Sequence, residues 1–469
     1  MSEQPRNDRP MAAAVTAELL AKYDRPGPRY TSYPTAVEFH DGFTADDYEG
    51  KLAEAAKAEG EALSLYLHLP FCHERCTFCG CNVIITRKHE PSDRYLHLLH
   101  REIEMVAERL GDRRDVVQYH WGGGTPTYQS IEEMQTLQQV VNRHFDFLPS
   151  AEVAIEVDPR VTTDEQLTAL RDLGFNRLSM GVQDFRPEVQ EAINRNQTLD
   201  ETERLFDTAR NLGYESINID LVYGLPLQAV DTFRETLREV IRLRPDRVAC
   251  YSFAHIPWIR GNQRRIRPED LPEAEVKLQL FGTAMEEFLS DGYEQIGLDH
   301  FALPEDELAV AARNRTLHRN FMGYTVKPAT DMIGLGVSSI GDLRGAYAQN
   351  TKKLSAYQRA IEGGTLPIER GVELSTDDLI RRDVITRLMC NFHLDRRAIE
   401  RRWNIDFAEY FSAELPALAE PVDHGFVTMT DDTIEVVGAG RLFIRNVCMI
   451  FVAYLAAKTG SRPMFSRTV

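Results

Sequence analysis

Three cysteines with a short, regular spacing are the residues of this chain best suited to chemistry. Cys72, Cys76 and Cys79 lie on one tight loop directly after an apolar run, and Gly80 follows them. Three thiolates can hold three corners of a cubane iron–sulfur cluster. The fourth iron then has no protein ligand and stays open to an incoming amino-carboxylate cofactor. The motif therefore predicts a [4Fe–4S] cluster with one open iron.

A fourth cysteine, Cys81, leaves two alternatives open at this loop. Structural zinc would add Cys81 or His73 as its fourth ligand, but zinc sites usually combine two short motifs that are distant in sequence. A four-cysteine electron-transfer cluster would use Cys81, although Cys79 and Cys81 are cramped for adjacent corners. The chain has seven cysteines, an odd number. A metal site in a reducing compartment fits this pattern better than a disulfide framework.

The elements that must position the loop are alternating strands and helices. Segments between the apolar runs carry helical spacing, as in Phe233–Ile241. Capping boxes are expected to begin helices after Thr163 and at Thr232, and Gly174 and Gly213 stand where helices should end. We expect strands at 62–69, 116–122, 151–157, 176–182, 216–224 and 247–253. This repeat predicts a parallel sheet.

Glycine and polar residues gather at the ends of these expected strands. Gly122–Gly124 follow the second strand, Glu156 and Asp158 lie in the third turn, Gln183 follows the fourth strand, and Asp220 lies within the fifth. A single such residue is more often a helix cap or a solvated strand end. Because they recur at successive strand ends, they predict the active face of a βα-barrel.

The length of 469 residues exceeds the usual domain range of ~50–250 residues, so we expect more than one domain. An N-terminal extension is expected over residues 1–55, interrupted by prolines and packed on the barrel. The catalytic barrel and its following segments should cover 56–370. A small domain with helices and a wing of short strands should cover 371–469.

Charge and hydropathy exclude several classes of protein. The formal net charge of -18 opposes binding to nucleic acids and anionic membranes. The chain opens without a signal-peptide pattern, and its longest apolar run, Val447–Ala457, is shorter than the roughly 20 residues that span a bilayer. We expect that run to be a buried helix. A cytoplasmic protein is predicted, with no membrane span and no nucleic-acid partner, and a monomer because nothing demands a second copy.

The motifs together resemble those of a known superfamily. The CxxxCxxC loop, followed by GGGTP at Gly122–Pro126, resembles the radical S-adenosylmethionine (SAM) superfamily, in which the cluster cleaves SAM to give a 5′-deoxyadenosyl radical. More narrowly, the chain resembles the oxygen-independent coproporphyrinogen III dehydrogenase family from about Pro28 onward. The matching segments are PRYTSYP (28–34), YLHLPFC (66–72), Cys81, HWGGGTPT (120–127), VDPR (157–160), GVQDF (181–185), IGLDHFA (296–302), HRNFMGYT (318–325) and RRDVI (381–385).

The resemblance implies a fold and roles for single residues. The fold would be α/β, a partial (β/α)6 TIM-like radical SAM barrel with an N-terminal extension and a small, mainly helical C-terminal domain. Cys72, Cys76 and Cys79 would bind the cluster, with two SAM molecules bound. Positions that match SAM contacts in the family are Tyr66, Phe78, Gly123, Gly124, Thr125, Glu156, Gln183, Arg195, Asp220, Ala254 and Ile340.

The resemblance also implies coproporphyrinogen III as substrate. Two of its four propionates would become vinyl groups, giving protoporphyrinogen IX, after hydrogen is taken from the propionate β-carbon. No side-chain acid or base can break that unactivated C–H bond, so the cofactor must supply the hard step. The reaction also needs an electron donor and an electron acceptor, which the sequence does not identify.

Two further residue types bear on the substrate. Arg29, Arg313, Arg315 and Arg319 lie in segments able to face the barrel mouth, and Arg29 is the leading candidate for a carboxylate clamp. Cys81 favours the dehydrogenase, since relatives that resemble haem chaperones tend to carry phenylalanine there. A haem chaperone and a radical SAM methyltransferase that opens haem remain as alternatives.

Overall fold

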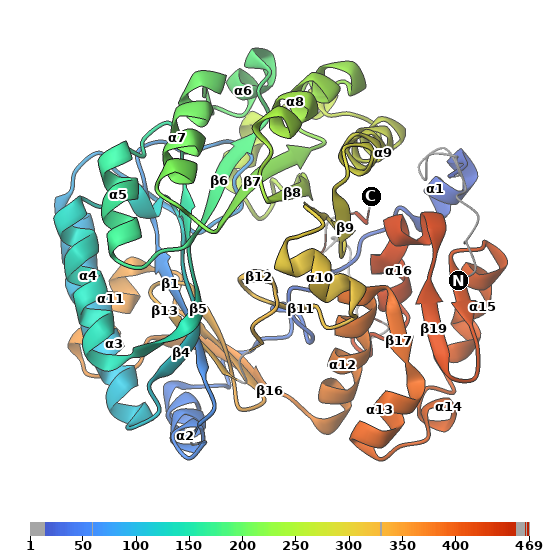
Figure 1. Cartoon of the computed structure of the whole chain (residues 1–469). Helices are drawn as coiled ribbons and strands as arrows, with labels where there is room; N and C mark the ends of the chain where they lie inside the picture. The colour runs from blue at the N-terminus through green and yellow to red at the C-terminus, as the bar shows by residue number, and fades with distance from the viewer. Residues whose placement is uncertain (1–14, 59, 329–330, 456–464, 466, 469) are drawn as a thin grey trace.

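The computed structural model describes residues 15–58, 60–328, 331–455, 465 and 467–468. Its centre is a curved sheet with helices on the outer face (Figure 1). The middle of the sheet is the parallel series β1 (Leu63–Leu69), β4 (Asp115–Gly123), β5 (Asp146–Val157), β6 (Arg177–Gln183), β7 (Ser216–Tyr223) and β8 (Arg247–Ser252). All six expected strands are confirmed.

Antiparallel strands extend the sheet at both ends. Beyond β8 come β10 (His300–Ala302) and β9 (Glu294–Ile296). On the other side, β13 (Asp331–Leu335) pairs parallel with β1 and is followed by β14 (Ile340–Leu343), β15 (Ala346–Asn350) and β16 (Ile368–Glu373). The described strands form one 12-stranded sheet that ends in β16 and β9. Because these end strands do not pair with each other, the expected partial barrel is confirmed.

The outer helices pack one apolar stripe each on the sheet. In α3 the side chains of Leu96, Leu99, Ile103, Val106 and Leu110 are all buried, at the spacing expected for a helix face. The helices of this layer are α2 (Ala45–Ala55), α3 (Glu90–Leu110), α4 (Ile131–His144), α5 (Asp164–Asp172), α6 (Pro187–Ala192), α7 (Leu199–Asn211), α8 (Val230–Leu243), α9 (Ala274–Ser290) and α11 (Leu354–Glu362).

The expected helix ends are confirmed at three positions and wrong at one. The Thr163 capping box is present, and Gly174 and Gly213 adopt φ values of +98° and +74° just past their helices. Thr232, in contrast, is the third residue of α8. The helix begins earlier because the Thr232 hydroxyl accepts from the backbone N–H of Ala229, which is the N-cap.

The C-terminal region has an apolar cluster of its own. It contains α12 (Thr376–Asn391), β17 (His393–Asp395), α13 (Arg396–Trp403), α14 (Phe407–Tyr410), α15 (Ala419–Asp423), β18 (Val427–Met429), β19 (Thr433–Val436) and α16 (Ile444–Met449). The expected helices and wing strands are therefore present. The helix expected over Val447–Ala457 is shorter, since α16 ends at Met449, although Val447, Cys448 and Phe451 are buried. Residues 456–457 lie outside the described part.

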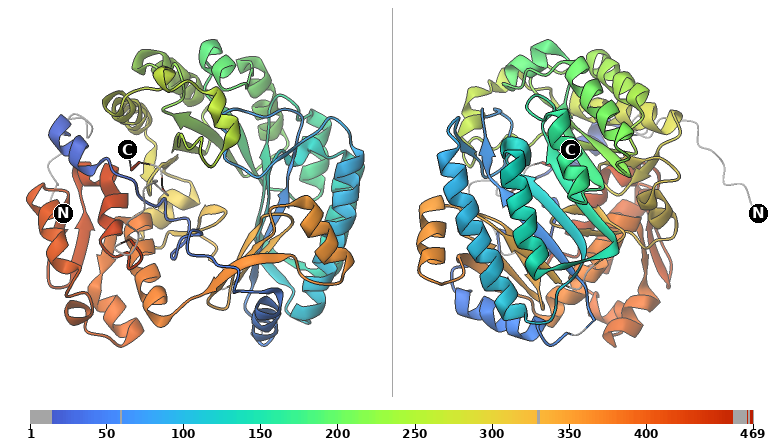
Figure 2. Two further views of the ribbon diagram at one scale, coloured as in Figure 1. Left: turned by 180° about the vertical axis from the view of Figure 1, so that it is seen from behind. Right: turned by 60° about the vertical axis from the view of Figure 1, so that its left-hand side comes forward.

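An N-terminal strap, residues 24–44, runs between the barrel and the C-terminal region after α1 (Ala17–Tyr23) (Figure 2). Tyr30 and Tyr33 are buried in the C-terminal apolar cluster. Arg445, from α16, donates hydrogen bonds to the carbonyl oxygens of Gly27 and Pro28. The strap thus joins the two regions, and the domain limits at 55/56 and 370/371 stay a prediction.

Between the barrel and the C-terminal region lies a short hairpin, β11 (His318–Asn320) and β12 (Gly323–Thr325), which follows α10 (Glu307–Arg313). Its Asn320 donates to Gln118 of β4 over 2.9 Å. Thr325 donates to Glu152 of β5 over 3.4 Å. These two hydrogen bonds hold the hairpin against β4 and β5. No helix in the described ranges is both long enough and apolar enough to cross a bilayer.

Candidate active site

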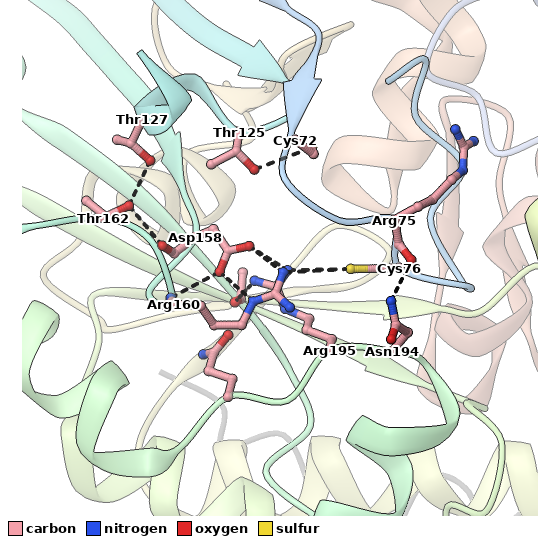
Figure 3. Close-up of polar contacts among 12 residues, drawn as sticks. Cys72, Arg75, Cys76, Thr125, Thr127, Asp158, Arg160, Thr162, Asn194 and Arg195 are labelled. Atoms are coloured by element: carbon pink, nitrogen blue, oxygen red, sulfur yellow. Dashed lines mark hydrogen bonds and ion pairs between the residues drawn. The ribbon is translucent and has the colours of Figure 1, made fainter. Parts of the chain in front are cut away.

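The cysteine loop begins at β2 (Phe71–Cys72), which pairs parallel with β3 (Ile84–Ile85). Cys72, Cys76 and Cys79 all line one cavity of about 850 Å³, the main cavity. Sγ of Cys72 lies 3.5 Å from Oγ1 of Thr125, a contact drawn in Figure 3. Sγ of Cys76 lies 3.9 Å from the guanidinium groups of Arg160 and Arg195. The loop thus directs three thiols at a shared space with cations beside it.

These residues fit an iron–sulfur cluster better than a single zinc ion. A zinc ion would draw its ligands together at about 2.3 Å for each sulfur. No three His, Cys, Asp or Glu side chains of the described residues are arranged around one such point. The backbone N–H of Cys81 donates to Sγ of Cys79 over 3.4 Å, and hydrogen bonds to sulfur are among the protein contacts that tune clusters.

One amide side chain holds the backbone of the cysteine loop. Asn262, on a 3-10 helix at Gly261–Arg265, places Nδ2 3.2, 2.9 and 3.0 Å from the carbonyl oxygens of Cys76, Thr77 and Cys79. This single NH₂ group fixes the turn on which two of the three thiols lie. Sequence reasoning missed Asn262, because a main-chain contact across the fold leaves no local pattern.

Two more amides complete this support. Gln263 donates from Nε2 to the carbonyl oxygens of Phe78 and Ala254 over 3.0 and 3.1 Å. These bonds tie the loop to the segment that follows β8. Asn194 donates to the carbonyl of Arg75 over 3.0 Å (Figure 3). The loop is therefore held by two segments, one that follows β6 and one that follows β8.

Glu156 is a carboxylate of the cavity wall, 43% exposed, that is held in its charged form. Its two oxygens lie 3.3 Å from Nε2 of His120 and 3.1 Å from the amide nitrogen of Gly123. Burial alone would raise the pKa of Glu156, but these hydrogen bonds and the nearby histidine lower it below its usual value. A Cβ on Gly122 would lie 2.8 Å from Oε1 of Glu156, which would have to move, and one on Gly123 would lie 2.6 Å from His68 at a φ of +116° that favours glycine.

Gly124 and Thr125, at the end of β4, hydrogen-bond to the chain at the end of β1. The amide nitrogen of Gly124 donates to Leu69, and that of Thr125 to Phe71, each over 2.9 Å. A Cβ on Gly124 would lie 2.6 Å from the backbone of Pro70. The glycine at 124 therefore allows the close approach that sets Thr125 beside Cys72.

A three-residue charge cluster forms another wall. Asp158 pairs with Arg160 over 2.7 Å and with Arg195 over 3.1 Å (Figure 3). Although burial would raise the pKa of Asp158, the two guanidinium groups lower it. Arg195 also donates to the carbonyl of Gly181 over 2.6 Å. The pairing fixes Arg195 next to Cys76.

Asp220 lies deeper in the main cavity, on β7. It accepts hydrogen bonds from Ser179 over 3.1 Å and from Asn218 over 2.8 Å. Burial, and then the charge of Glu156, raise the pKa of Asp220 to about 6. Gln183 lines the same cavity from the end of β6 with φ of +72°. These polar groups suit the hydroxyl and amine groups of a small ligand.

Comparisons with known proteins agree with this geometry. A family model described as the radical SAM superfamily matches residues 66–240. The oxygen-independent coproporphyrinogen III oxidase of Salmonella typhimurium is 46% identical over 451 residues, covering 96% of this chain and 98% of that protein. The enzyme of that name from Helicobacter pylori strain J99 is 40% identical over 457 residues, or 97% and 99% of the two chains. The chain belongs to the oxygen-independent coproporphyrinogen III oxidase family.

A solved structure extends the likeness to three dimensions. The Escherichia coli coproporphyrinogen III oxidase, described as a radical SAM enzyme, superposes with a TM-score of 0.88 at 46% identity and covers 91% of this chain and 98% of its own. The chain is accordingly an oxidoreductase whose cofactors are a [4Fe–4S] cluster and SAM. The relatives are named for the oxidase reaction, which supports the oxidase over the haem chaperone and the haem-opening methyltransferase.

Within this family member, most predicted site residues line the main cavity. They are Cys72, Cys76, Cys79, Cys81, Arg29, Phe78, Gly123, Gly124, Thr125, Glu156, Gln183, Arg195, Asp220 and Ala254. Tyr66 lies directly behind this wall, where its ring carbon would be 3.1 Å from a Cβ on Gly122 and its hydroxyl is 3.0 Å from Nδ1 of His68.

Ile340 is the predicted SAM contact that the structure does not bring to this wall. It lies at the start of β14, two strands away from β1, and packs against an apolar cluster of Phe39, Tyr347 and Leu374. Gly334 of β13 pairs with Tyr66 of β1 and lies against the backbone of Ile340, so Ile340 follows Tyr66 along one row of the sheet. Its contact with SAM therefore stays a prediction.

Of the four candidate arginines, one lines the main cavity. Arg29 lines the main cavity and donates to the carbonyl of Ser252 at the end of β8. Arg313 and Arg315 do not, because they are exposed and pair with Glu294 and Glu435. Arg319 lines a separate cavity, described below. The expectation that all four could face the main mouth is wrong for three of them.

Proposed function

We propose that this protein catalyses the anaerobic oxidative decarboxylation of two propionates of coproporphyrinogen III to vinyl groups, giving protoporphyrinogen IX. The observation that carries the proposal is the main cavity, where three cysteine thiols and the polar groups of four strand ends meet in a chain similar end to end to coproporphyrinogen III oxidases.

In this proposal Cys72, Cys76 and Cys79 hold the cluster. When bound, the cluster and SAM supply a primary carbon radical, the reagent needed to break an unactivated C–H bond. The protein supplies position. Asn262 holds the loop carbonyls, and the guanidinium groups of Arg160 and Arg195 lie 3.9 Å from Sγ of Cys76.

The remaining walls would bind SAM, and we propose that two molecules bind. The ionised Glu156 suits a cationic amino group, and Arg195 suits a carboxylate. Asp220 would accept from ribose hydroxyls, as acidic residues do in nucleotide sites. Backbone groups at Gly123, Gly124 and Thr125, with Tyr66, Phe78, Gln183, Ala254 and Ile340, complete the proposed contacts.

At the substrate, each reacting propionate loses carbon dioxide, one hydrogen atom and one electron as its vinyl group forms. Arg29 would grip a propionate through its planar guanidinium, which matches a carboxylate in two hydrogen bonds. Cys81, on the same wall as the three cluster cysteines, would serve as a hydrogen donor or as a group beside the cluster. The electron donor and acceptor would be separate partners. We also propose a cytoplasmic monomer.

Anaerobic reconstitution tests the function. We expect about four irons and four sulfides per chain, release of 5′-deoxyadenosine with SAM and a reductant, and conversion of coproporphyrinogen III to a divinyl product. A Cys81→Ser enzyme that still cleaves SAM but forms no vinyl group would support a functional thiol. Haem binding without decarboxylation would overturn the proposal.

A further inference from the structure

A second cavity, of about 440 Å³, lies where the strap, the β11–β12 hairpin and α12 meet. Five arginines and His318 line it, against two carboxylates, Asp342 and Asp383. This excess of positive charge stands out in a chain of net charge -18. We propose that the second cavity binds propionate groups of the tetrapyrrole other than the one that reacts, with Arg319 as the principal cation. The inference rests on the proposed function and names a part of the substrate site.

Arg319 is distinct among these arginines. Its guanidinium lies 4.7 Å from the centre of the Tyr324 ring, and one nitrogen donates to the Tyr324 hydroxyl over 3.2 Å. Its Nε is shielded from solvent and has no hydrogen-bond partner, and none of the ion pairs found in the described residues includes Arg319. The charge of Asp299 acts on Arg319 but forms no ion pair with it, so the guanidinium still has donors that an anion in the cavity could use.

The other arginines of the cavity share the available carboxylates. Arg382 pairs with Asp342 over 3.0 Å. Arg387 and Arg402 both approach Asp383, at 2.7 and 3.4 Å, and Trp403 donates to it as well. Because the two carboxylates are already used, an incoming carboxylate would find cations but little competing negative charge.

The strap adds one hydroxyl next to these arginines. Tyr30 and Ser32 line the second cavity, and their hydroxyl oxygens are shielded from solvent without a hydrogen-bond partner among the described residues. Most buried polar atoms of proteins find a partner. The Tyr30 hydroxyl interacts with Cys448 and Arg445, which do not line the cavity, so in this proposal Ser32 alone would turn its hydroxyl to a bound carboxylate.

The second cavity is adjacent to the main cavity. Arg29 lines the main cavity, and the four residues that follow it, 30–33, line the second. A series of ring contacts also joins them: Tyr251 of the main cavity lies 5.5 Å from His300, which lies 5.0 Å from Tyr324, the ring beneath Arg319. The rings of Tyr251, His300 and Tyr324 therefore lie in series between the wall of the main cavity and Arg319.

The charges of the main cavity leave few free cations for the substrate. Its inner arginines, Arg160 and Arg195, are paired with Asp158, and Arg87 is paired with Glu74. Arg29 and Arg75 would then face a substrate with four carboxylates. In this proposal a macrocycle gripped by Arg29 at one edge extends along strap residues 30–33 to the second cavity, which would fix which propionate points at the cysteine loop.

The experiment compares binding of two porphyrins to anaerobic, reconstituted enzyme by fluorescence quenching. Coproporphyrin III, the oxidised form of the substrate, has four carboxylates, and deuteroporphyrin has two. We expect Arg319→Gln to weaken coproporphyrin III binding about 10- to 100-fold, the range for a lost charged hydrogen bond, and to change deuteroporphyrin binding much less. KM for coproporphyrinogen III should rise while the SAM dissociation constant stays the same.

Matched variants keep the test independent of folding. Arg313→Gln removes an exposed arginine six positions earlier that lines neither cavity, and should bind both porphyrins like the wild type. Should Arg319→Gln fail to fold, as judged by thermal unfolding, Ser32→Ala and Arg387→Gln take its place, with several-fold losses expected.

The outcomes separate this inference from the function itself. Unchanged coproporphyrin III affinity and KM in all three cavity variants, in an enzyme whose wild type forms the divinyl product, overturn the inference alone. A wild type that forms no vinyl product overturns the function and the inference together. Inorganic phosphate that displaces coproporphyrin III from the wild type at millimolar concentration would identify a general anion site and also overturn the inference.

Discussion

The two cavities differ in how their charges are balanced. In the main cavity each carboxylate has a cation or hydrogen-bond donors of its own, as Asp158 has Arg160 and Arg195 and Glu156 has His120. In the second cavity arginines outnumber carboxylates, and Arg319 forms no ion pair among the described residues, although the charge of Asp299 acts on it. A site with both signs of charge suits a ligand that carries both, whereas a site with excess cations suits a polyanion.

The largest effect is expected when a cluster ligand of the main cavity is removed. Cys76→Ala should leave less than the full complement of iron after reconstitution and abolish release of 5′-deoxyadenosine, because one of three ligands is gone. Cys250→Ala, which removes a buried thiol of β8 outside both cavities, is the control and should keep its iron. Iron analysis and product chromatography measure both. Full iron in Cys76→Ala would mean that another residue binds the cluster.

A second variant tests whether the support of the loop matters as much as its thiols. Asn262→Asp keeps the size of the side chain but replaces a donor near three carbonyl oxygens by a negative charge. We expect the loss of roughly 2–3 kcal/mol of loop stabilisation and a cluster that is released many times faster to a chelator. Asn211→Asp, at the exposed end of α7, is the control. Equal release rates in the two variants would contradict a positioning role.

A third variant concerns the buried acid of the main cavity. The folded-state pKa of Asp220, about 6, lies above its ordinary value of 3.8, so the folded protein binds the extra proton and loses stability as pH rises from about 4 to 6. Asp220→Asn should therefore add roughly 2–3 kcal/mol at pH 7.5, less near pH 5, and almost nothing below pH 4. Denaturant unfolding of the SAM-free protein at these pH values measures it. An equal gain at every pH would exclude titration as the cause.

The smallest effect is expected on KM, from a change at Arg29, which lies where the two cavities adjoin along the strap. Arg29→Ala should raise KM for coproporphyrinogen III by about ten-fold, for one charged hydrogen bond, with little change in the SAM dissociation constant. Arg315→Ala, an exposed arginine paired with Glu435 at the rim of the second cavity, should have a smaller effect. Steady-state kinetics distinguish them. An unchanged KM in Arg29→Ala would refute the carboxylate clamp.

Local patterns predicted the parts of this fold that depend on local physics. The six parallel strands followed from apolar runs, and the helix ends at Gly174 and Gly213 from the need for positive φ. The cysteine spacing, and the glycines that let Glu156 approach, also follow from the chain itself. These features are determined within a few residues of one another.

What depends on distant segments was missed. The contacts of Asn262 with the cysteine loop join residues nearly two hundred positions apart, and the burial of Arg319 depends on a hairpin held against β4 and β5. The ion pairs of Arg313 and Arg315 were missed for the same reason, since their partners Glu294 and Glu435 lie in late strands. Sequence distance between partners, rather than residue type, limited the prediction.

The anchoring of the strap has a consequence for biosynthesis. The cysteine loop has all its described supports once residues up to Gln263 have been made, because Asn194, Asn262 and Gln263 hold it. The strap carrying Arg29 is held by Arg445, close to the end of the chain. Since a chain emerges from the ribosome N-terminus first, the cluster-binding part can fold while translation continues. The wall proposed to grip the substrate is completed only near the end of synthesis.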